Sequence, residues 1–158
     1  MQKYLFASLL FLLILPVFSQ AQVKLITVDQ LESRFANGKD TVYVVNFWAT
    51  WCSPCVAEMP NFEKLQASYS SEPLKVLMIS VDFKSKLQSA VIPFVKKKKF
   101  ANEVFLLDEK SQQVYIDRIS KDWSGALPAT MFVNKNTRKI YEQEFSYDQL
   151  ESVYKSSK

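Results

Sequence analysis

Residues 41–49 (TVYVVNFWA) are a run in which every side chain except Asn46 is β-branched, aromatic or otherwise apolar. A strand with one face in water would alternate polar and apolar residues, so this run predicts a central strand that is buried on both faces. Such strands are typical of parallel sheets that are covered by helices on both sides. A second apolar run follows at residues 74–81, beyond a helical segment, and the pair indicates an α/β fold.

The rest of the chain continues this alternation and ends in a hairpin. We expect helices at Val28–Asn37, 53–69 (interrupted at Pro60), 85–100 (with Ser85 as N-cap and Pro93 kinking or ending it), 110–119 and 147–155. We expect further strands at 104–107, 131–133 and 139–145, the last two joined by a turn at 134–137. This order predicts one α/β domain with a central mixed sheet and helices on both faces.

The first residues are typical of a secretory signal peptide. Lys3 precedes a short, nearly continuous apolar run, and Ser19-Gln20-Ala21 gives a small-x-small cleavage pattern. The alternative is an uncleaved membrane anchor, but the run is shorter than the roughly 20 residues that a spanning helix needs. We therefore expect a signal peptide at residues 1–21, a mature chain from Gln22, and a single domain at residues 22–158.

Composition excludes several classes of function. The chain has no histidine, which removes Ser-His-Asp and Cys-His hydrolases, His-ligated zinc sites and haem attachment. Its two glycines, Gly38 and Gly125, cannot form a phosphate-binding loop. The net charge is +4, with a lysine run at residues 96–99 that we interpret as a solvated helix end. A lipid or polyanion patch is the alternative, and we expect no nucleic-acid partner.

Two cysteines remain, in Cys52-Ser53-Pro54-Cys55, directly after the predicted 41–49 strand. The carboxyl ends of such strands are where open α/β sheets carry their active sites. Cys52 would lie at a helix N-terminus, where backbone N–H groups and the helix dipole lower a thiol pKa from about 8.5 to between about 3.5 and 7.5. Cys52 is therefore the candidate nucleophile, and Cys55, one turn further in, is the candidate resolving thiol.

Two other interpretations of the cysteine pair stay open at this point. An inert disulfide closing so small a loop would stabilise the fold little, because it restricts the unfolded chain little. Two thiolates without histidine would leave zinc undercoordinated, although they could hold copper. We expect no metal and no bound cofactor.

The surrounding residues resemble a known family. Residues 45–55 (VNFWATWCSPC), followed by Glu58 and Pro60, are similar to the active-site segment of thioredoxin-like proteins of the exported TlpA/ResA type. Residues 127–133 (LPATMFV) resemble the strand of that family that follows a cis-proline, and residues 79–82 resemble its next strand end. These matches cover most of residues 41–145, and the resemblance implies a thioredoxin-like fold.

The resemblance also implies site residues. Pro128 would be a cis-proline that shapes a groove for an extended peptide, and the backbone of Leu127 would pair with the target strand. Trp51 would contact the substrate beside the sulfurs. Thioredoxins proper carry an aspartate where this chain has Asn46, so Glu58 is the candidate for proton transfer; its alternative is an ordinary solvated helix residue.

The activity that the resemblance implies is dithiol–disulfide exchange in the bacterial periplasm or cell envelope. Proteins of this type are reductases that receive electrons from a membrane partner and act on disulfides of exported proteins, often apocytochromes. We therefore expect a monomeric protein-disulfide reductase, with protein disulfides as substrates and a membrane electron donor. The alternatives are a disulfide oxidase or isomerase, and a non-catalytic copper-binding or adaptor protein.

Overall fold

The structure is a computed structural model that describes residues 22–38 and 40–158. The predicted signal peptide lies outside the described residues. The strands are β1 (Lys24–Ile26), β2 (Val42–Trp48), β3 (Leu74–Ser80), β4 (Glu103–Leu107), β5 (Ala129–Val133) and β6 (Arg138–Tyr141). The helices are α1 (Val28–Asn37), α2 (Ser53–Ser68), α3 (Ile92–Lys98), α4 (Gln112–Ile119) and α5 (Tyr147–Ser156), with short turns η1 (Lys84–Lys86) and η2 (Leu87–Val91) before α3.

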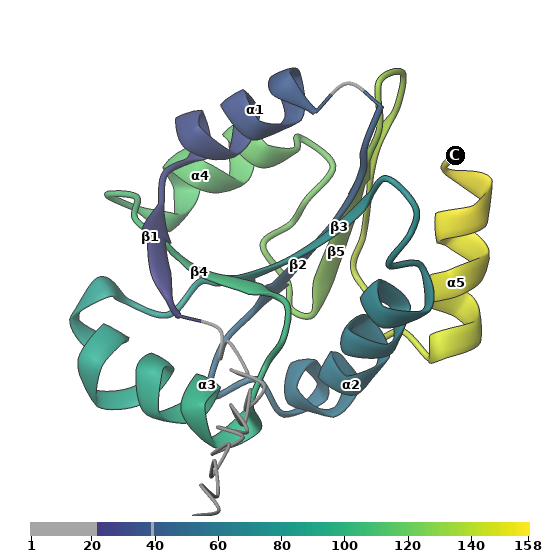
Figure 1. Cartoon of the computed structure of the whole chain (residues 1–158). Coiled ribbons are helices and arrows are strands. Elements are labelled where there is room, and N and C mark those ends of the chain that lie inside the picture. Colours follow the sequence, from purple (N-terminus) through teal and green to yellow (C-terminus); the bar gives the residue numbers. More distant parts are fainter. Residues whose placement is uncertain (1–21, 39) are drawn as a thin grey trace, which may run out of the picture.

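The six strands form one mixed sheet in the order β1-β4-β3-β2-β5-β6. The first four in this order are parallel, whereas β5 and β6 are antiparallel to their neighbours. As the apolar run at 41–49 predicted, β2 is central and all seven of its residues are buried. Figure 1 shows α1 and α4 against one face of the sheet, and α2, α3 and α5 against the other.

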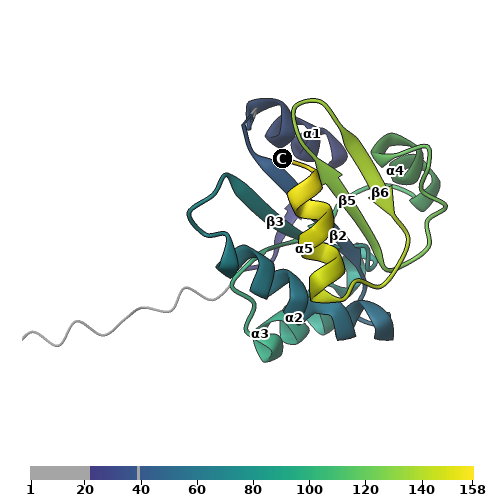
Figure 2. The same ribbon diagram turned by 90° about the vertical axis from the view of Figure 1, so that its right-hand side faces the viewer.

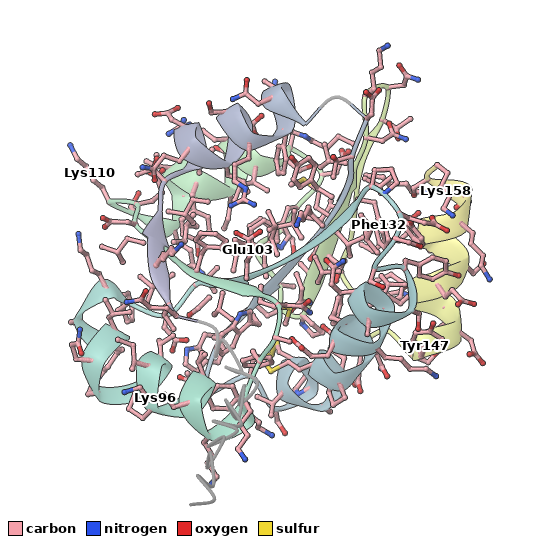
Figure 3. The ribbon with its side chains drawn as sticks, viewed as in Figure 1. Lys96, Glu103, Lys110, Phe132, Tyr147 and Lys158 are labelled. Atoms are coloured by element: carbon pink, nitrogen blue, oxygen red, sulfur yellow. A yellow bond between two sulfur atoms is a disulfide. The ribbon has the colours of Figure 1, made fainter. Side chains whose placement is uncertain are left out.

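Each face of the sheet has its own hydrophobic core. Leu31 of α1 and Tyr115 of α4 pack against one face, and Phe62 of α2 and Leu150 of α5 pack against the other. Figure 2 shows α5 lying in front of the sheet beside α2, and Figure 3 shows Phe132 of β5 between the sheet and α5. The expected α/β fold, with a mixed sheet and helices on both faces, is therefore present.

Three local expectations were wrong. The predicted helix at 85–100 is divided into η1, η2 and α3, so Ser85 lies inside a 3-10 turn and caps nothing. Pro93 lies in the first turn of α3, where no N–H is needed, so it starts this helix instead of ending it. Pro60 does not interrupt α2, which runs through it from Ser53 to Ser68.

Smaller differences concern the strands and where they end. The strand expected at 139–145 ends at Tyr141, and Phe145 is buried in the connection to α5. Strand β1 was not expected, because three residues are too short for a periodic pattern. Among the described residues, no helix combines the length and the hydropathy required to cross a membrane.

Candidate active site

The Cys52–Cys55 pair lies where β2 leads into α2, at the carboxyl edge of the sheet. The two sulfurs form a disulfide, and the Cα atoms are 5.3 Å apart. The exposed fraction of Cys52 is 5%, whereas Cys55 is completely buried against the core. A reagent in solution can therefore reach the sulfur of Cys52 more readily than that of Cys55.

Cys52 is the N-cap of α2. Its Sγ accepts a hydrogen bond of 3.3 Å from the backbone N–H of Cys55, and its own N–H donates to the Ala49 carbonyl at 3.1 Å. The first turn of α2 contains no acidic residue, and Pro54 occupies a position where the helix needs no donor. The Cys52 sulfur therefore lies at the positive end of a 16-residue helix, the setting that favours a thiolate.

A buried aspartate holds the turn before Cys52 in place. The Asp82 carboxylate accepts hydrogen bonds from the Thr50 N–H at 2.9 Å, from Thr50 Oγ1 at 2.7 Å and from Ser80 Oγ at 2.8 Å. Asp82 thus connects the end of β3 to the turn between β2 and α2. From the sequence, Asp82 was included only in the segment 79–82, which resembles a strand end of the thioredoxin-like family. The available signal was an acidic residue two positions after a mostly apolar strand.

Glu58 is buried under the active-site helix, with an exposed fraction of 1%, so the alternative of a solvated helix residue is wrong. Its Oε1 accepts from Asn46 Nδ2 at 2.8 Å, and its Oε2 accepts from the Phe145 N–H at 2.7 Å. Burial raises the pKa of Glu58 to about 7, although these two hydrogen bonds favour the charged form. A carboxyl with this pKa can both hold and release a proton near neutral pH.

Asn46 connects Glu58 to the sheet. Its Nδ2 also donates to Thr130 Oγ1 of β5 at 3.2 Å, whereas its Oδ1 is buried and has no donor among the described residues. A buried acceptor without a donor is costly. A rotation of the Asn46 amide would turn Oδ1 toward Glu58, and the hydroxyl of a protonated Glu58 could then donate to it. The pair is therefore suited to a Glu58 that changes its protonation state.

Leu127 and Pro128, which the resemblance assigned to a substrate groove, lie directly before β5. The Leu127–Pro128 peptide bond is cis. Because β5 is antiparallel to β2, with Ala129 opposite Phe47, the start of β5 lies at the same edge of the sheet as the cysteine pair. Trp51, directly before Cys52, is 70% exposed. Among the described residues, no group of three or more Cys, Asp or Glu side chains is arranged to hold a metal ion.

Comparisons with known proteins agree with this geometry. Residues 16–142 match the model of the AhpC/TSA family. The thiol-disulfide oxidoreductase ResA of Bacillus anthracis is 30% identical over 114 residues, which are 70% of this chain and 60% of ResA. ResA of Geobacillus thermodenitrificans (strain NG80-2) is 28% identical over 109 residues, 66% of this chain and 55% of that protein. The chain thus spans less than two thirds of the length of these curated relatives.

A solved structure shows the fold of the domain. The thioredoxin-related protein from Neisseria meningitidis serogroup B superposes with a TM-score of 0.64 at 22% sequence identity, and the match covers 75% of this chain and 86% of that one. The fold is therefore thioredoxin-like, as the resemblance predicted.

Proposed function

The chain belongs to the AhpC/TSA family of thioredoxin-like proteins, and on that premise we propose that it is a thiol–disulfide oxidoreductase that reduces disulfides of exported proteins. One observation carries this proposal: the Cys52 sulfur accepts the backbone N–H of Cys55 at the start of α2, while Cys55 is buried behind it. This arrangement gives the two thiols of the reduced protein different reactivities, so that Cys52 is the attacking thiol and Cys55 the resolving one.

The exchange proceeds in two balanced steps. The Cys52 thiolate attacks one sulfur of the target disulfide, so that a Cys52–target disulfide forms and the second target sulfur leaves as a thiolate and takes up a proton. Cys55 then loses its proton and attacks the Cys52 sulfur, which releases the first target sulfur as a thiolate that also takes up a proton. The target gains two electrons and two protons, and the protein is left with the Cys52–Cys55 disulfide. A dithiol donor must reduce this disulfide before the next cycle.

Glu58 is the proposed acceptor of the Cys55 proton. It lies three residues after Cys55 on the same helix, so both side chains share one face of α2. A base must have a pKa near the working pH to accept and return a proton efficiently, and burial gives Glu58 a pKa of about 7. Asn46 and the Phe145 N–H orient the carboxylate for this role.

The direction of exchange that the site favours is reduction. Strong oxidants stabilise the thiolate heavily and so favour their reduced form. Here the first turn of α2 carries no lysine or arginine, so the helix N-terminus is the stabiliser within that turn. An ionised Glu58 on the same helix would also repel the negative charge of a cysteine thiolate and so disfavour that thiolate. Both features keep the thiolate only moderately stable and the reduction potential comparatively negative.

Export and partners complete the proposal. The segment 1–21 supports export to the periplasm or cell envelope, where protein disulfides form, and a membrane dithiol protein is the proposed electron donor. Monomeric action, and a role in cytochrome c maturation through apocytochrome substrates, belong to the same proposal. Sequencing of the mature N-terminus tests the export step: a start at Gln22 supports it, and retention of Met1–Ala21 in a membrane pellet supports the anchor.

A trapping experiment tests the function itself. Cys55→Ser removes the resolving thiol, so the variant should remain covalently bound to its substrates through Cys52, and reductant should release them. Cys52→Ser is the matched control, because the thiol that it keeps is buried and should trap nothing. The absence of any exchange with protein disulfides would favour a non-catalytic adaptor.

The reduction potential decides the direction. Equilibration of the Cys52–Cys55 pair against glutathione and dithiothreitol buffers measures it. A value below about −200 mV supports a reductase, whereas a value near roughly −120 mV is that of a strong oxidant and would overturn this direction.

A further inference from the structure

A cavity is lined by Trp51, the residue directly before Cys52, and by residues that follow β3 and β4, on the side of β2 away from Leu127 and Pro128. Its volume is about 330 Å³, and its rim carries Trp51 and Phe83. The exposed fractions of these two side chains are 70% and 81%, the highest among the large apolar residues of the described chain. Two solvent-exposed aromatic rings at the rim of one cavity are uncommon in a soluble domain, and exposed apolar patches of this kind mark binding sites.

The register of the sheet explains why the two rings meet. Trp48 of β2 lies opposite Ser80 of β3, and Trp51 and Phe83 are each three residues further along their chains. Leu107, the last residue of the next strand, β4, contributes the floor. The cavity is therefore built from the turns that follow three neighbouring parallel strands, at the edge where open α/β sheets bind their ligands.

Hydrogen bonds and an ion pair hold the walls of the cavity in position. Asp82 joins the turn that contains Phe83 to Thr50, next to Trp51. Lys84 joins the same turn to Asp108, after β4, with 2.7 Å between Nζ and Oδ2. A site whose loops are already fixed binds its ligand with a small loss of conformational entropy.

The interior of the cavity selects an apolar group. Leu107 and Tyr115 are buried and form its base. Of the charged side chains around it, Glu109 accepts the Val28 N–H at 2.7 Å, and Lys110 extends away from the body of the domain (Figure 3). Ser111 and Gln112 also line the cavity, but its lining is more apolar than polar. The apolar part comes from the rings at the rim and the buried base, and the volume suits one large side chain.

The proposed exchange reaction indicates that the target polypeptide is the molecule that binds at this cavity. A target cysteine must come within bonding distance of the Cys52 sulfur, which brings a residue beside that cysteine within reach of Trp51, the exposed residue directly before Cys52. We propose that the cavity between Trp51 and Phe83 binds a large apolar side chain, aromatic above all, that lies next to the reacting cysteine of the target polypeptide. This inference rests on the proposed function and adds a substrate preference to it: cystines flanked by bulky apolar residues.

The test compares two synthetic peptides. Each contains one intramolecular disulfide, and they differ only in the residue beside one cysteine, which is Phe in one and Ser in the other. The rate at which the reduced protein reduces each peptide is followed by tryptophan fluorescence. We expect the Phe peptide to react about tenfold faster, a difference of about 1.4 kcal/mol. Phe83→Ala should reduce this ratio to about one.

Val114→Ala is the matched control. Val114 is 46% exposed on the neighbouring helix α4 and does not line the cavity, so its loss should leave the tenfold ratio unchanged. Equal rates for the two peptides with the unsubstituted protein, or a ratio that survives Phe83→Ala, would overturn the inference. Hydroxyethyl disulfide, which has no side chain for the cavity, separates the two proposals: failure to reduce it as well would refute the oxidoreductase function itself.

Discussion

The substitution Glu58→Gln tests whether the active site contains a buried ionisable carboxyl. Glutamine has the shape of glutamate but does not titrate. In the wild type, burial raises the pKa of Glu58 from 4.5 to about 7. The unfolded chain gives up the Glu58 proton near 4.5, whereas the folded protein keeps it up to about 7. Over this interval the folded state binds more protons, so its stability falls as the pH rises.

The size of the effect follows from the shift in pKa. A difference of about 2.5 units between the folded and unfolded states corresponds to about 3 kcal/mol, because each unit is worth about 1.4 kcal/mol. Nearly all of this loss should occur between pH 4 and pH 8, and none of it in the glutamine variant. For a domain whose total stability is of the order of 5–15 kcal/mol, this change is easily measured.

A second, pH-independent contribution comes from hydrogen bonding. Below its pKa of about 7, the protonated Glu58 carboxyl offers one acceptor and one O–H donor, and glutamine offers one acceptor and one N–H donor. The offset between the two neutral side chains is therefore small, below about 1 kcal/mol. The variant should be close to wild type in stability near pH 4 and more stable near pH 8, where the wild type carries a buried charge.

The assay is denaturant unfolding of the oxidised protein at intervals from pH 4 to pH 8. The difference in unfolding free energy between variant and wild type isolates Glu58, because all other groups cancel. A difference that changes by about 3 kcal/mol across this range supports the assignment. A difference that is constant with pH would show that the Glu58 carboxyl ionises as freely in the folded protein as in the unfolded chain, and the proton-transfer role would fail with it.

Two further predictions concern the cysteine pair and the turn before it. Thiolate formation in the two single-cysteine variants can be followed by ultraviolet absorbance against pH. Cys52, measured in Cys55→Ser, should ionise at a lower pH than Cys55, measured in Cys52→Ser, because only Cys52 caps α2. Equal titration of the two thiols near about 8.5 would refute the helix argument. Asp82→Ala leaves Thr50 without its acceptor and should cost about 2 kcal/mol of stability and slow exchange several-fold; Asp82→Asn, which can still accept, should recover most of the stability.

The sequence by itself determined the architecture. The apolar run of β2, the helical period of α1 and the turn residues before β6 are local patterns, and each element formed close to its expected position. The cysteine pair was placed correctly at the end of β2, because its position follows from the two elements next to it in the sequence, β2 and α2. Where local patterns conflicted with packing, prediction failed: Pro60 did not break α2, which is held on both sides of it by buried core residues.

Tertiary structure alone decided the environment of Glu58. The sequence could not distinguish a proton-transfer group from a solvated helix residue, because the group that buries and bonds the carboxylate, the Phe145 N–H, is 87 residues away. The sequence also could not predict the hydrogen bonds between Asp82 and Thr50, which are 32 residues apart, or the cavity between Trp51 and Phe83. Periodicity reports which way a side chain faces within its own element. The pKa of a carboxyl and the shape of a cavity depend instead on which distant elements the sheet order brings together.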